Sequence, residues 1–372
     1  MNPTSASSYQ ASVDVEKAGF GDSKFDYSEQ DYRYAEKQFT QLLETENLDH
    51  ALQTGTVDSS FVDGAVTDAI ETVYLNGEPA PAAHRFLQRI LYFINRLKLF
   101  WYDDLQHYTN ERSHYLIMLR DRIELAWQQW ENSQLNLDSY RNLDIKQALL
   151  QRAELDVDPP LSHEAKFFRE QVGLAGYREL VAIGALDGLV EASQLSRTLG
   201  GVANDVHAVL TRLLVEEYGA GRLPRKHSSY YLTMLEELGM QTEPEAYLDA
   251  VPWEVLATIN HSFLLTERKR YFLRYIGGLF YIELTVPAAF SSYQVAAERL
   301  GLSDAAMTYW KLHIKVDELH GKWMLNDATL PLVDQYPVDA WELLWGYDQQ
   351  KYMGDRAGAA VARAAYQADE RG

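Results

Sequence analysis

The sequence predicts an all-α protein, and three observations support that prediction. Apolar residues recur with the 3.6-residue period of a helix in almost every long segment. No segment alternates apolar and polar residues in the way that a half-buried strand requires. Short clusters of Gly, Pro and Asn separate the periodic segments, as turns between helices do. With 372 residues, 47% of them hydrophobic, the chain is long enough for one large domain or two smaller ones.

The N-terminal part begins with a polar stretch, residues 1–26, which predicts a disordered leader. Beyond the leader, the period and the turn signals predict helices at 28–53, 60–75, 80–108, 111–134 and 139–154. The segment LDVDPPLSH at 155–163 is the best linker, because its consecutive prolines end one helix before the next helix cap. We therefore expect a helical N-terminal domain over 27–157 and a second domain over 158–372.

The second part is also expected to be helical throughout. The predicted helices are 163–173, 176–198, 202–218, 224–239, 243–248, 252–285, 288–300, 303–326 and 338–366. Pro287 has no amide hydrogen to donate to the carbonyl of Glu283, so we expect a kink or a helix end at that point.

The composition excludes several kinds of chemistry and of partner. Without cysteine, the chain forms no disulfide, iron–sulfur cluster or thiolate site. Its net charge of −20, from 34 basic and 54 acidic residues, would repel nucleic acid phosphates and anionic lipid. The polar N-terminus has no signal-peptide core, and no stretch of about 18 apolar residues could span a membrane. We expect a cytoplasmic protein that binds a small molecule or another protein.

One predicted helix, 303–326, carries three candidate metal ligands on a single face. Ser303 is a suitable N-cap, and no proline interrupts the residues that follow it as far as the third ligand. Measured from His313 at about 100° per residue, Asp317 lies at about +40° and His320 at about −20°. Apolar residues one turn before and one turn after share this stripe, whereas lysine and glutamate occupy the opposite face. The three side chains are therefore expected to be buried.

Burial of these three polar groups requires a partner. An ionised carboxylate and two imidazoles that are buried without partners cost several kcal/mol. A metal ion would satisfy them, since neutral imidazoles and carboxylates are ordinary ligands of iron, manganese and zinc. The alternative is a buried hydrogen-bond network without metal.

A second triplet with the same spacing lies in the N-terminal part, at His107, Glu111 and His114. Its expected helix face also includes two aspartates and an asparagine, at 103, 104 and 110. Such a face is solvated, and a coincidental triplet costs nothing there. We interpret this triplet as surface residues rather than as a metal site.

Other predicted core helices place single ionisable residues on apolar stripes. Glu217 continues one stripe, His227 heads the next along the chain, and Glu283 ends a third. In the helix before them two acids remain open: the period favours Glu179, whereas small residues around Glu191 could leave room for a metal or a substrate. Taken singly, each acid is more often a capping or solvated group, and a lone histidine is more often a satisfied core residue.

Together, these residues need a common explanation, because several buried ionisable groups lie on separate helices. One site with three or four carboxylates and three histidines suits two iron ions. A helical bundle can hold such a cluster between facing helices. A lone zinc ion would need fewer ligands.

The motif HIKVDELH at 313–320, preceded by a glutamate and a histidine ten residues apart, resembles the haem-oxygenase-like di-iron oxidases. The resemblance covers roughly 163–366, and its spacing is most similar to the amino-acid N-oxygenases, including the N-oxygenase domain of the streptozotocin-pathway enzyme. It implies a haem-oxygenase-like helical bundle preceded by a smaller helical domain. The region before the bundle is more weakly similar to the dimerising N-terminal part of those enzymes, which implies a homodimer.

The resemblance also implies a set of metal ligands. The first-helix glutamate of the family falls on Glu191 rather than on Glu179. The full implied set is Glu191, Glu217, His227, Glu283, His313, Asp317 and His320. Glu283 occupies the position of an additional carboxylate that marks the N-oxygenase branch, and it favours N-oxygenation over the branch that cleaves C–C bonds and forms alkenes.

The implied function is the O2-dependent oxygenation of the amine or guanidine nitrogen of an amino acid or a derivative, in specialised-metabolite biosynthesis. The product would be a hydroxylamine, or a nitroso or nitro compound after further oxidation. The implied cofactor is two iron ions that alternate between Fe2+ and Fe3+, with electrons from an external reductase or reductant. The first alternative is a di-iron oxidase that cleaves or desaturates an amino or fatty acid, and the second is a non-catalytic helical interaction protein.

Two further expectations follow. The streptozotocin-pathway enzyme carries a C-terminal cupin that finds no counterpart in this sequence, so simple N-oxygenation is expected rather than a rearrangement of the product. The buried face of the helix at 310–322 is unsatisfied without metal, so we expect this segment to be mobile or partly unwound without iron and ordered by it.

Overall fold

A computed structural model of the chain describes residues 27–100, 105–201 and 204–372. Within those ranges the chain forms α-helices, short 3₁₀ and π-helical turns, and loops, with no strand, which confirms the all-α prediction. The expected leader lies outside the described residues. No helix in the described part of the chain is both long enough and apolar enough to cross a membrane.

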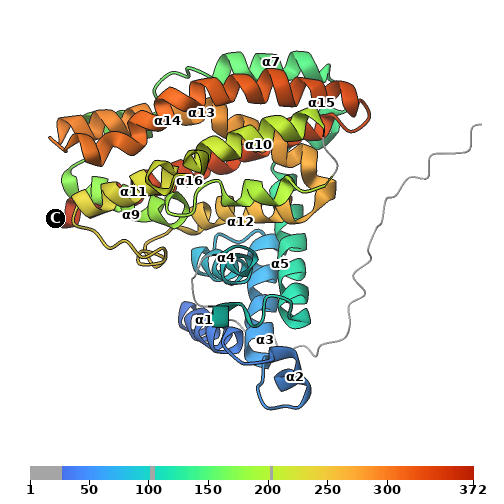
Figure 1. Ribbon diagram of the computed structural model, residues 1–372. Coiled ribbons are helices and arrows are strands. Elements are labelled where there is room, and N and C mark those ends of the chain that lie inside the picture. The colour runs from blue at the N-terminus through green and yellow to red at the C-terminus, as the bar shows by residue number, and fades with distance from the viewer. Residues whose placement is uncertain (1–26, 101–104, 202–203) are drawn as a thin grey trace, which may run out of the picture.

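The first five helices form the lower part of the molecule in Figure 1. They are α1 (Glu29–Leu43), α2 (Leu48–Gln53), α3 (Ser60–Ile70), α4 (Pro81–Asn95) and α5 (His114–Ser133). Helix α1 begins at a capping box, in which the Ser28 side chain accepts from the amide of Asp31 and the Asp31 carboxylate accepts from the amide of Ser28. The apolar faces of these helices meet around fully buried residues such as Phe39 and Trp127.

The remaining helices form the upper part of the molecule in Figure 1. The α-helices are α6 (Leu137–Tyr140), α7 (Ile145–Asp156), α8 (His163–Glu170), α9 (Leu174–Gly188), α10 (Asp205–Glu217), α11 (His227–Glu237), α12 (Trp253–Glu267), α13 (Phe272–Arg299), α14 (Asp304–Trp323), α15 (Leu330–Gln335) and α16 (Trp341–Arg371). A π-helical turn, η8 (Met324–Thr329), continues α14 into α15. The long helix α13 packs against both α14 and α16, and α9 packs along α16.

Two hydrophobic clusters hold the helices together. The larger cluster is continuous from the N-terminal helices into the bundle, since Leu87 of α4, Phe263 of α12 and Tyr347 of α16 all belong to it. The smaller cluster joins α8, α9, α11, α13, α14 and α16 around the buried rings of Tyr231 and Trp310. The candidate site lies beside this smaller cluster.

Helix α7 lies on the N-terminal side of the expected linker and packs against the C-terminal helix. Arg152 of α7 donates to both carboxylate oxygens of Asp348 of α16, at 2.6 and 2.7 Å. The hydroxyl of Tyr347 donates to Asp156 at the end of α7, at 3.0 Å. The linker at 157–162 is a loop, and the division at 157/158 into two domains remains a prediction.

The predicted helix break near Pro287 is wrong. Helix α13 runs unbroken from Phe272 through Pro287 to Arg299, because its packing against α14 and α16 outweighs the one hydrogen bond that proline cannot make. The break lies instead at Arg268, whose backbone is extended (φ −115°, ψ 107°). The Arg268 guanidinium forms an ion pair with Glu124 of α5, which is almost fully buried.

Several other predicted boundaries differ from the structure. The predicted helix 28–53 is two helices, because Asn47 adopts a left-handed conformation (φ 50°) that no helix interior tolerates. The predicted helix 80–108 ends at Asn95 and is followed by 3₁₀ turns at 96–98 and 105–108. The predicted helix 243–248 is a series of turns. His107, Glu111 and His114 are exposed and do not share one helix, because α5 begins only at His114.

Helices α13 and α16 approach so closely that glycine is required at their crossing. A Cβ atom at Gly346 of α16 would lie 1.9 Å from the carbonyl oxygen of Arg274 of α13. A Cβ atom at Gly277 of α13 would lie 2.0 Å from the carbonyl oxygen of Leu343 of α16. The two glycines therefore set the distance between these helices, one of which carries Glu283.

Candidate metal centre

Helix α14 presents the three predicted candidates on one buried face. Ser303 caps the helix, and its hydroxyl accepts from the amide of Ala306 at 3.2 Å. His313, Asp317 and His320 are 4%, 3% and 0% exposed. The helical-wheel analysis therefore places these side chains as the structure has them.

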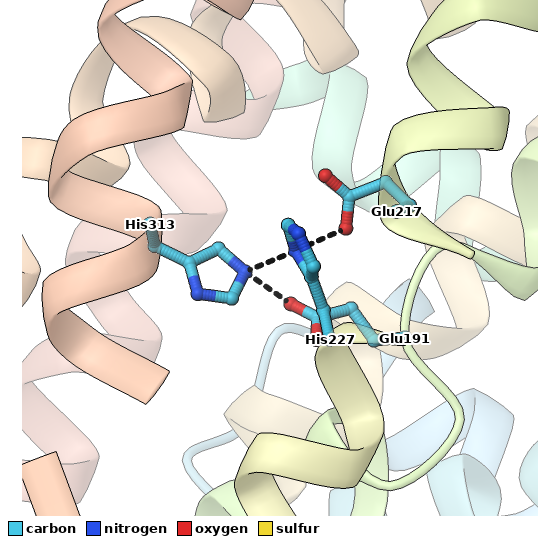
Figure 2. A group of neighbouring side chains, drawn as sticks. All are labelled: Glu191, Glu217, His227 and His313. Atoms are coloured by element: carbon cyan, nitrogen blue, oxygen red, sulfur yellow. Dashed lines mark hydrogen bonds and ion pairs between the residues drawn. The ribbon is translucent and has the colours of Figure 1, made fainter. Parts of the chain in front are cut away.

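Four side chains from four parts of the chain form a first group, which Figure 2 shows pointing toward one another. Nε2 of His313 lies 2.9 Å from Oε1 of Glu191 and 3.1 Å from Nδ1 of His227. The same nitrogen of His227 lies 2.8 Å from Oε2 of Glu217. Helix α14 contributes His313, the first residue of α11 is His227, and the last residue of α10 is Glu217.

A second group lies next to the first and shares Glu217 with it. This group consists of Glu217, Asp317 and His320. Nδ1 of His320 lies 3.6 Å from Oε1 of Glu217 and 3.3 Å from Oδ1 of Asp317. Glu283 of α13 adds a carboxylate, whose Oε2 lies 3.2 Å from the same nitrogen. The two oxygens of Glu217 thus face the two groups, Oε2 the first and Oε1 the second.

The bend between α10 and α11 brings Glu217 next to His227. Gly219 follows α10 with φ 60°, a conformation that favours glycine. A Cβ atom at Gly219 would lie 2.4 Å from the backbone carbon of Arg225, so the returning chain passes directly against it. A separation of ten residues, which would span several helical turns in one helix, becomes a direct contact between two helix ends.

Helix α14 also approaches α13 closely at the site. Gly321 follows His320, and a Cβ atom at that position would lie 3.3 Å from the backbone oxygen of Glu283. Because the two helices are so close, the carboxylate of Glu283 contacts the His320 ring.

Glu191, and not Glu179, belongs to the first group. The period of α9 favoured Glu179, but α9 ends at Gly188 and Glu191 lies in the turn beyond it. A helical wheel does not apply to a residue outside the helix. The ambiguity left by the sequence arose from that early helix end.

The carboxylates raise the pKa of the two buried histidines of α14. Burial alone disfavours the charged imidazolium, but the neighbouring Glu191 carboxylate outweighs it and raises the pKa of His313 to about 10. In the same way, Asp317 and Glu283 outweigh burial and raise the pKa of His320 to about 11. The chain therefore surrounds both rings with enough negative charge to hold a cation.

The carboxylates of the site respond to burial in different ways. Burial raises the pKa of Asp317 to about 7 and raises the pKa of Glu217 as well. Burial also disfavours the charged form of Glu191, but the His313 ring outweighs it and lowers the pKa of Glu191. Close carboxylates inside a protein require positive charge among them, which protonated histidines or metal ions can supply.

The donor set fits metal ions. Oε2 of Glu191 and Oδ1 of Asp317 are buried acceptors without a hydrogen-bond donor. Four carboxylates and three neutral imidazoles would balance two divalent cations, and oxygen and nitrogen donors of this kind suit iron. Glu217 belongs to both groups.

Two residues next to the site were not predicted from the sequence. Tyr309 donates its hydroxyl to Oε1 of Glu191 at 2.7 Å, and Oε2 of Glu216 lies 3.1 Å from Nε2 of His320. Tyr309 could have been found, because it lies one turn before His313 on the same stripe of α14. The side chain of Glu216 is 39% exposed although it contacts the buried His320.

Comparison with known proteins identifies the region that contains the site. Residues 178–350 match the model of a family described as iron-containing redox enzymes. A stretch of 153 residues is 28% identical to the nitrosourea synthase of Streptomyces achromogenes subsp. streptozoticus. That match covers 41% of this chain and 32% of the relative, so it spans about a third of the relative's length.

The comparisons bear on the predictions made from the sequence. The resemblance to an iron-dependent oxidase family and the haem-oxygenase-like all-α fold are confirmed. The matched family is described as redox enzymes, which favours the predicted oxidoreductase over a non-catalytic interaction protein. All seven predicted site residues lie within the matched range.

Proposed function

We propose that this chain, whose residues 178–350 match the family of iron-containing redox enzymes, is a di-iron N-oxygenase. Its substrate would be an amino acid or a derivative, and the oxygenated atom would be an amine or guanidine nitrogen. The observation that supports two iron ions most directly is the position of Glu217, which has one carboxylate oxygen in each of the two neighbouring groups.

The proposed ligands divide between the two positions. Glu191, His227 and His313 would hold the first iron, and Glu283, Asp317 and His320 the second. Glu217 would bridge them. When bound, the iron ions supply the reducing equivalents and the activation of dioxygen that the protein's own side chains cannot supply.

The protein's own residues would set the conditions for that chemistry. The seven proposed ligands come from helices α10, α11, α13 and α14 and from the turn that follows α9, and the packing of these segments brings the side chains together. The rings of Phe290 and Tyr309 pack against His313, and Trp310 packs against Phe290, so aromatic rings cover one side of the first position. Burial keeps the His320 ring at 0% exposure, so the second position is also shielded from bulk water.

Two observations support oxygenation at nitrogen. The name of the related nitrosourea synthase describes the synthesis of an N-nitroso compound, and its similarity to this chain is modest. Glu283, the additional carboxylate that the resemblance implies for the N-oxygenase branch, is buried, and its carboxylate lies next to the second group. An external electron donor, a homodimer and a cytoplasmic location are parts of the same proposal.

The proposal is tested by loading the chain with Fe2+ without oxygen, adding O2 labelled with heavy oxygen, and offering a panel of amino acids. Mass spectrometry should find labelled oxygen on a substrate nitrogen. His313→Ala should abolish the product, whereas the control His207→Ala should retain it, because His207 contacts Asn204 rather than the site. An alkene or a shortened acid without N-oxygenation would contradict the proposed reaction, and no oxygen consumption with any amino acid would contradict the substrate class.

A further inference from the structure

The contacts just outside the two groups involve two residues that the proposed ligand set does not include. We infer that Tyr309 and Glu216 are positioning residues, each of which holds ligands of one half of the metal centre. This inference rests on the proposed two-iron site and adds the residues that orient its ligands.

Tyr309 restrains two ligands of the first position at once. Its hydroxyl donates to Oε1 of Glu191 at 2.7 Å, and its backbone carbonyl lies 2.8 Å from Nδ1 of His313. The carbonyl contact makes Nδ1 the protonated nitrogen, so that Nε2 is the one free to bind metal. Nε2 is indeed the atom that faces Glu191 and His227.

The hydroxyl of Tyr309 is important for the position of the Glu191 carboxylate, because few other contacts restrain that side chain. Glu191 lies in a turn rather than in a helix, and the next residue, Ala192, has φ 59°. Its other oxygen, Oε2, is buried without a hydrogen-bond donor. Tyr309 is only 4% exposed and is fixed by the surrounding aromatic rings, so it offers a rigid donor at this point.

Glu216 orients the histidine of the second position. Its Oε2 lies 3.1 Å from Nε2 of His320, which leaves Nδ1 to face the carboxylates of Glu217, Asp317 and Glu283. A carboxylate that accepts from the outer nitrogen of a metal-binding histidine fixes the ring and strengthens it as a ligand.

Arg212 lies beside Glu216 on the same face of α10. Nε of Arg212 lies 3.8 Å from Oε1 of Glu216, and Glu216 follows Arg212 by one helical turn on α10. The Arg212 guanidinium stacks 3.4 Å above the ring of Trp323, whose centroid lies 5.4 Å from that of His320. The arginine thus ties the exposed end of α10 to the same turn of α14 that carries His320.

The two restraints act on different halves of the centre. The polar contacts of Tyr309 involve Glu191 and His313, whereas those of Glu216 involve His320 and Arg212. Loss of such an outer partner commonly lowers metal affinity by about 10- to 100-fold. Each substitution should therefore weaken one position and spare the other.

The test uses two variants that each leave one position intact. His320→Ala keeps the first position, and His313→Ala keeps the second. In each background, the affinity for Fe2+ is measured without oxygen, by competition with a coloured chelator. With His320→Ala present, Tyr309→Phe should weaken Fe2+ binding by about 10- to 100-fold and Glu216→Ala should not. With His313→Ala present, the two effects should be exchanged.

Matched controls separate positioning from general damage. The ring of Tyr231 is centred 4.8 Å from that of Tyr309, but its hydroxyl donates to the carbonyl of Val181. Tyr231→Phe removes this hydroxyl and should leave the Fe2+ affinity of both positions unchanged. Glu216→Gln keeps an acceptor oxygen and should restore most of the affinity that Glu216→Ala loses. Glu318→Ala removes an exposed carboxylate from α14 and should have no effect. Thermal unfolding establishes that each variant is folded.

The outcomes distinguish this inference from the proposed function. A wild-type chain that binds fewer than two Fe2+ ions contradicts the two-iron site itself. If the wild-type chain binds two ions, two results contradict only the positioning roles. Tyr309→Phe and Glu216→Ala could change the Fe2+ affinity equally in both backgrounds, or they could change it in neither. If a single-position variant binds no Fe2+, anomalous scattering from iron at each position in crystals of Tyr309→Phe and Glu216→Ala makes the same comparison in the otherwise unchanged chain.

Discussion

The crossing of α13 and α16 offers a stability test that also reaches the site. We consider Gly346→Ala, which would place a methyl carbon 1.9 Å from the carbonyl oxygen of Arg274. Carbon and oxygen atoms do not approach below 3.0 Å, so the helices would have to separate by about 1 Å at this point. The obstructing atoms are backbone, and no change of rotamer can relieve the contact.

The expected change in stability combines two opposing effects. Overpacking of this kind costs about 3 kcal/mol, at the upper end of the usual range because the backbone itself must move. Replacing glycine by alanine inside a helix returns about 1 kcal/mol. Gly346→Ala should therefore lower the free energy of unfolding by about 2 kcal/mol, as measured by urea denaturation.

Gly358 provides the matched control on the same helix. A Cβ atom at Gly358 would meet nothing within 4 Å, so Gly358→Ala receives only the gain in helix propensity, about 0.5 to 1 kcal/mol. Opening the crossing also displaces α13, which carries Glu283, and so Gly346→Ala should weaken Fe2+ binding whereas Gly358→Ala should not. Equal stability of the two variants would refute the reasoning about the crossing.

Three further predictions concern acid, a buried ion pair and iron. Burial lowers the pKa of His84 to about 4 and of His261 to about 3, so both rings stay neutral in the folded chain, whereas the unfolded chain takes up protons below about pH 6.5. The free energy of unfolding should therefore fall from pH 6.5 toward pH 5 by about 1.4 kcal/mol per pH unit for each histidine. In urea denaturation at several pH values, His84→Gln should make this slope shallower. Arg356→Met leaves Glu131, which is 1% exposed, without its ion-pair partner and should lower the free energy of unfolding by about 3 to 5 kcal/mol. Adding Glu131→Gln should recover part of this loss, and strictly additive effects of the two substitutions would contradict the coupling of the pair. Iron should slow amide hydrogen exchange in residues 310–322, which form a continuous part of α14, and equal protection with and without iron would contradict the expected ordering.

The sequence was most informative where one helix contains the whole pattern. His313, Asp317 and His320 belong to a single capped helix, and a regular period of 3.6 residues is enough to place them on one face. The same reasoning identified Glu217, His227 and Glu283, because each lies on an otherwise apolar stripe and is buried in the structure.

Sequence reasoning was weakest where the path of the chain depends on distant residues. Glu191 could not be chosen over Glu179 by period, because the end of α9 at Gly188 is set by packing. Pro287 predicted a break that the packing of α13 overrides, whereas Arg268 interrupts the helices where its side chain reaches Glu124. Local rules describe the helix, and tertiary contacts decide where it stops.

The contacts that surround the ligands were also beyond the sequence. Glu216 shares a helix face with Arg212, and its position near the end of α10 lets its carboxylate reach His320 of α14. A helical wheel gives the direction of a side chain but not its neighbour on another helix. Such contacts require the coordinates of both helices.

The central claim is that two iron ions share Glu217, and a count of bound iron tests it most directly. The wild-type chain and Glu217→Ala are loaded with Fe2+ without oxygen, freed of unbound metal, and analysed for iron per chain. The wild type should retain two iron ions, and the variant should lose affinity at both positions because one carboxylate serves both. A wild type that retains a single ion, or a Glu217→Ala variant that binds two ions as tightly as the wild type, would contradict the claim.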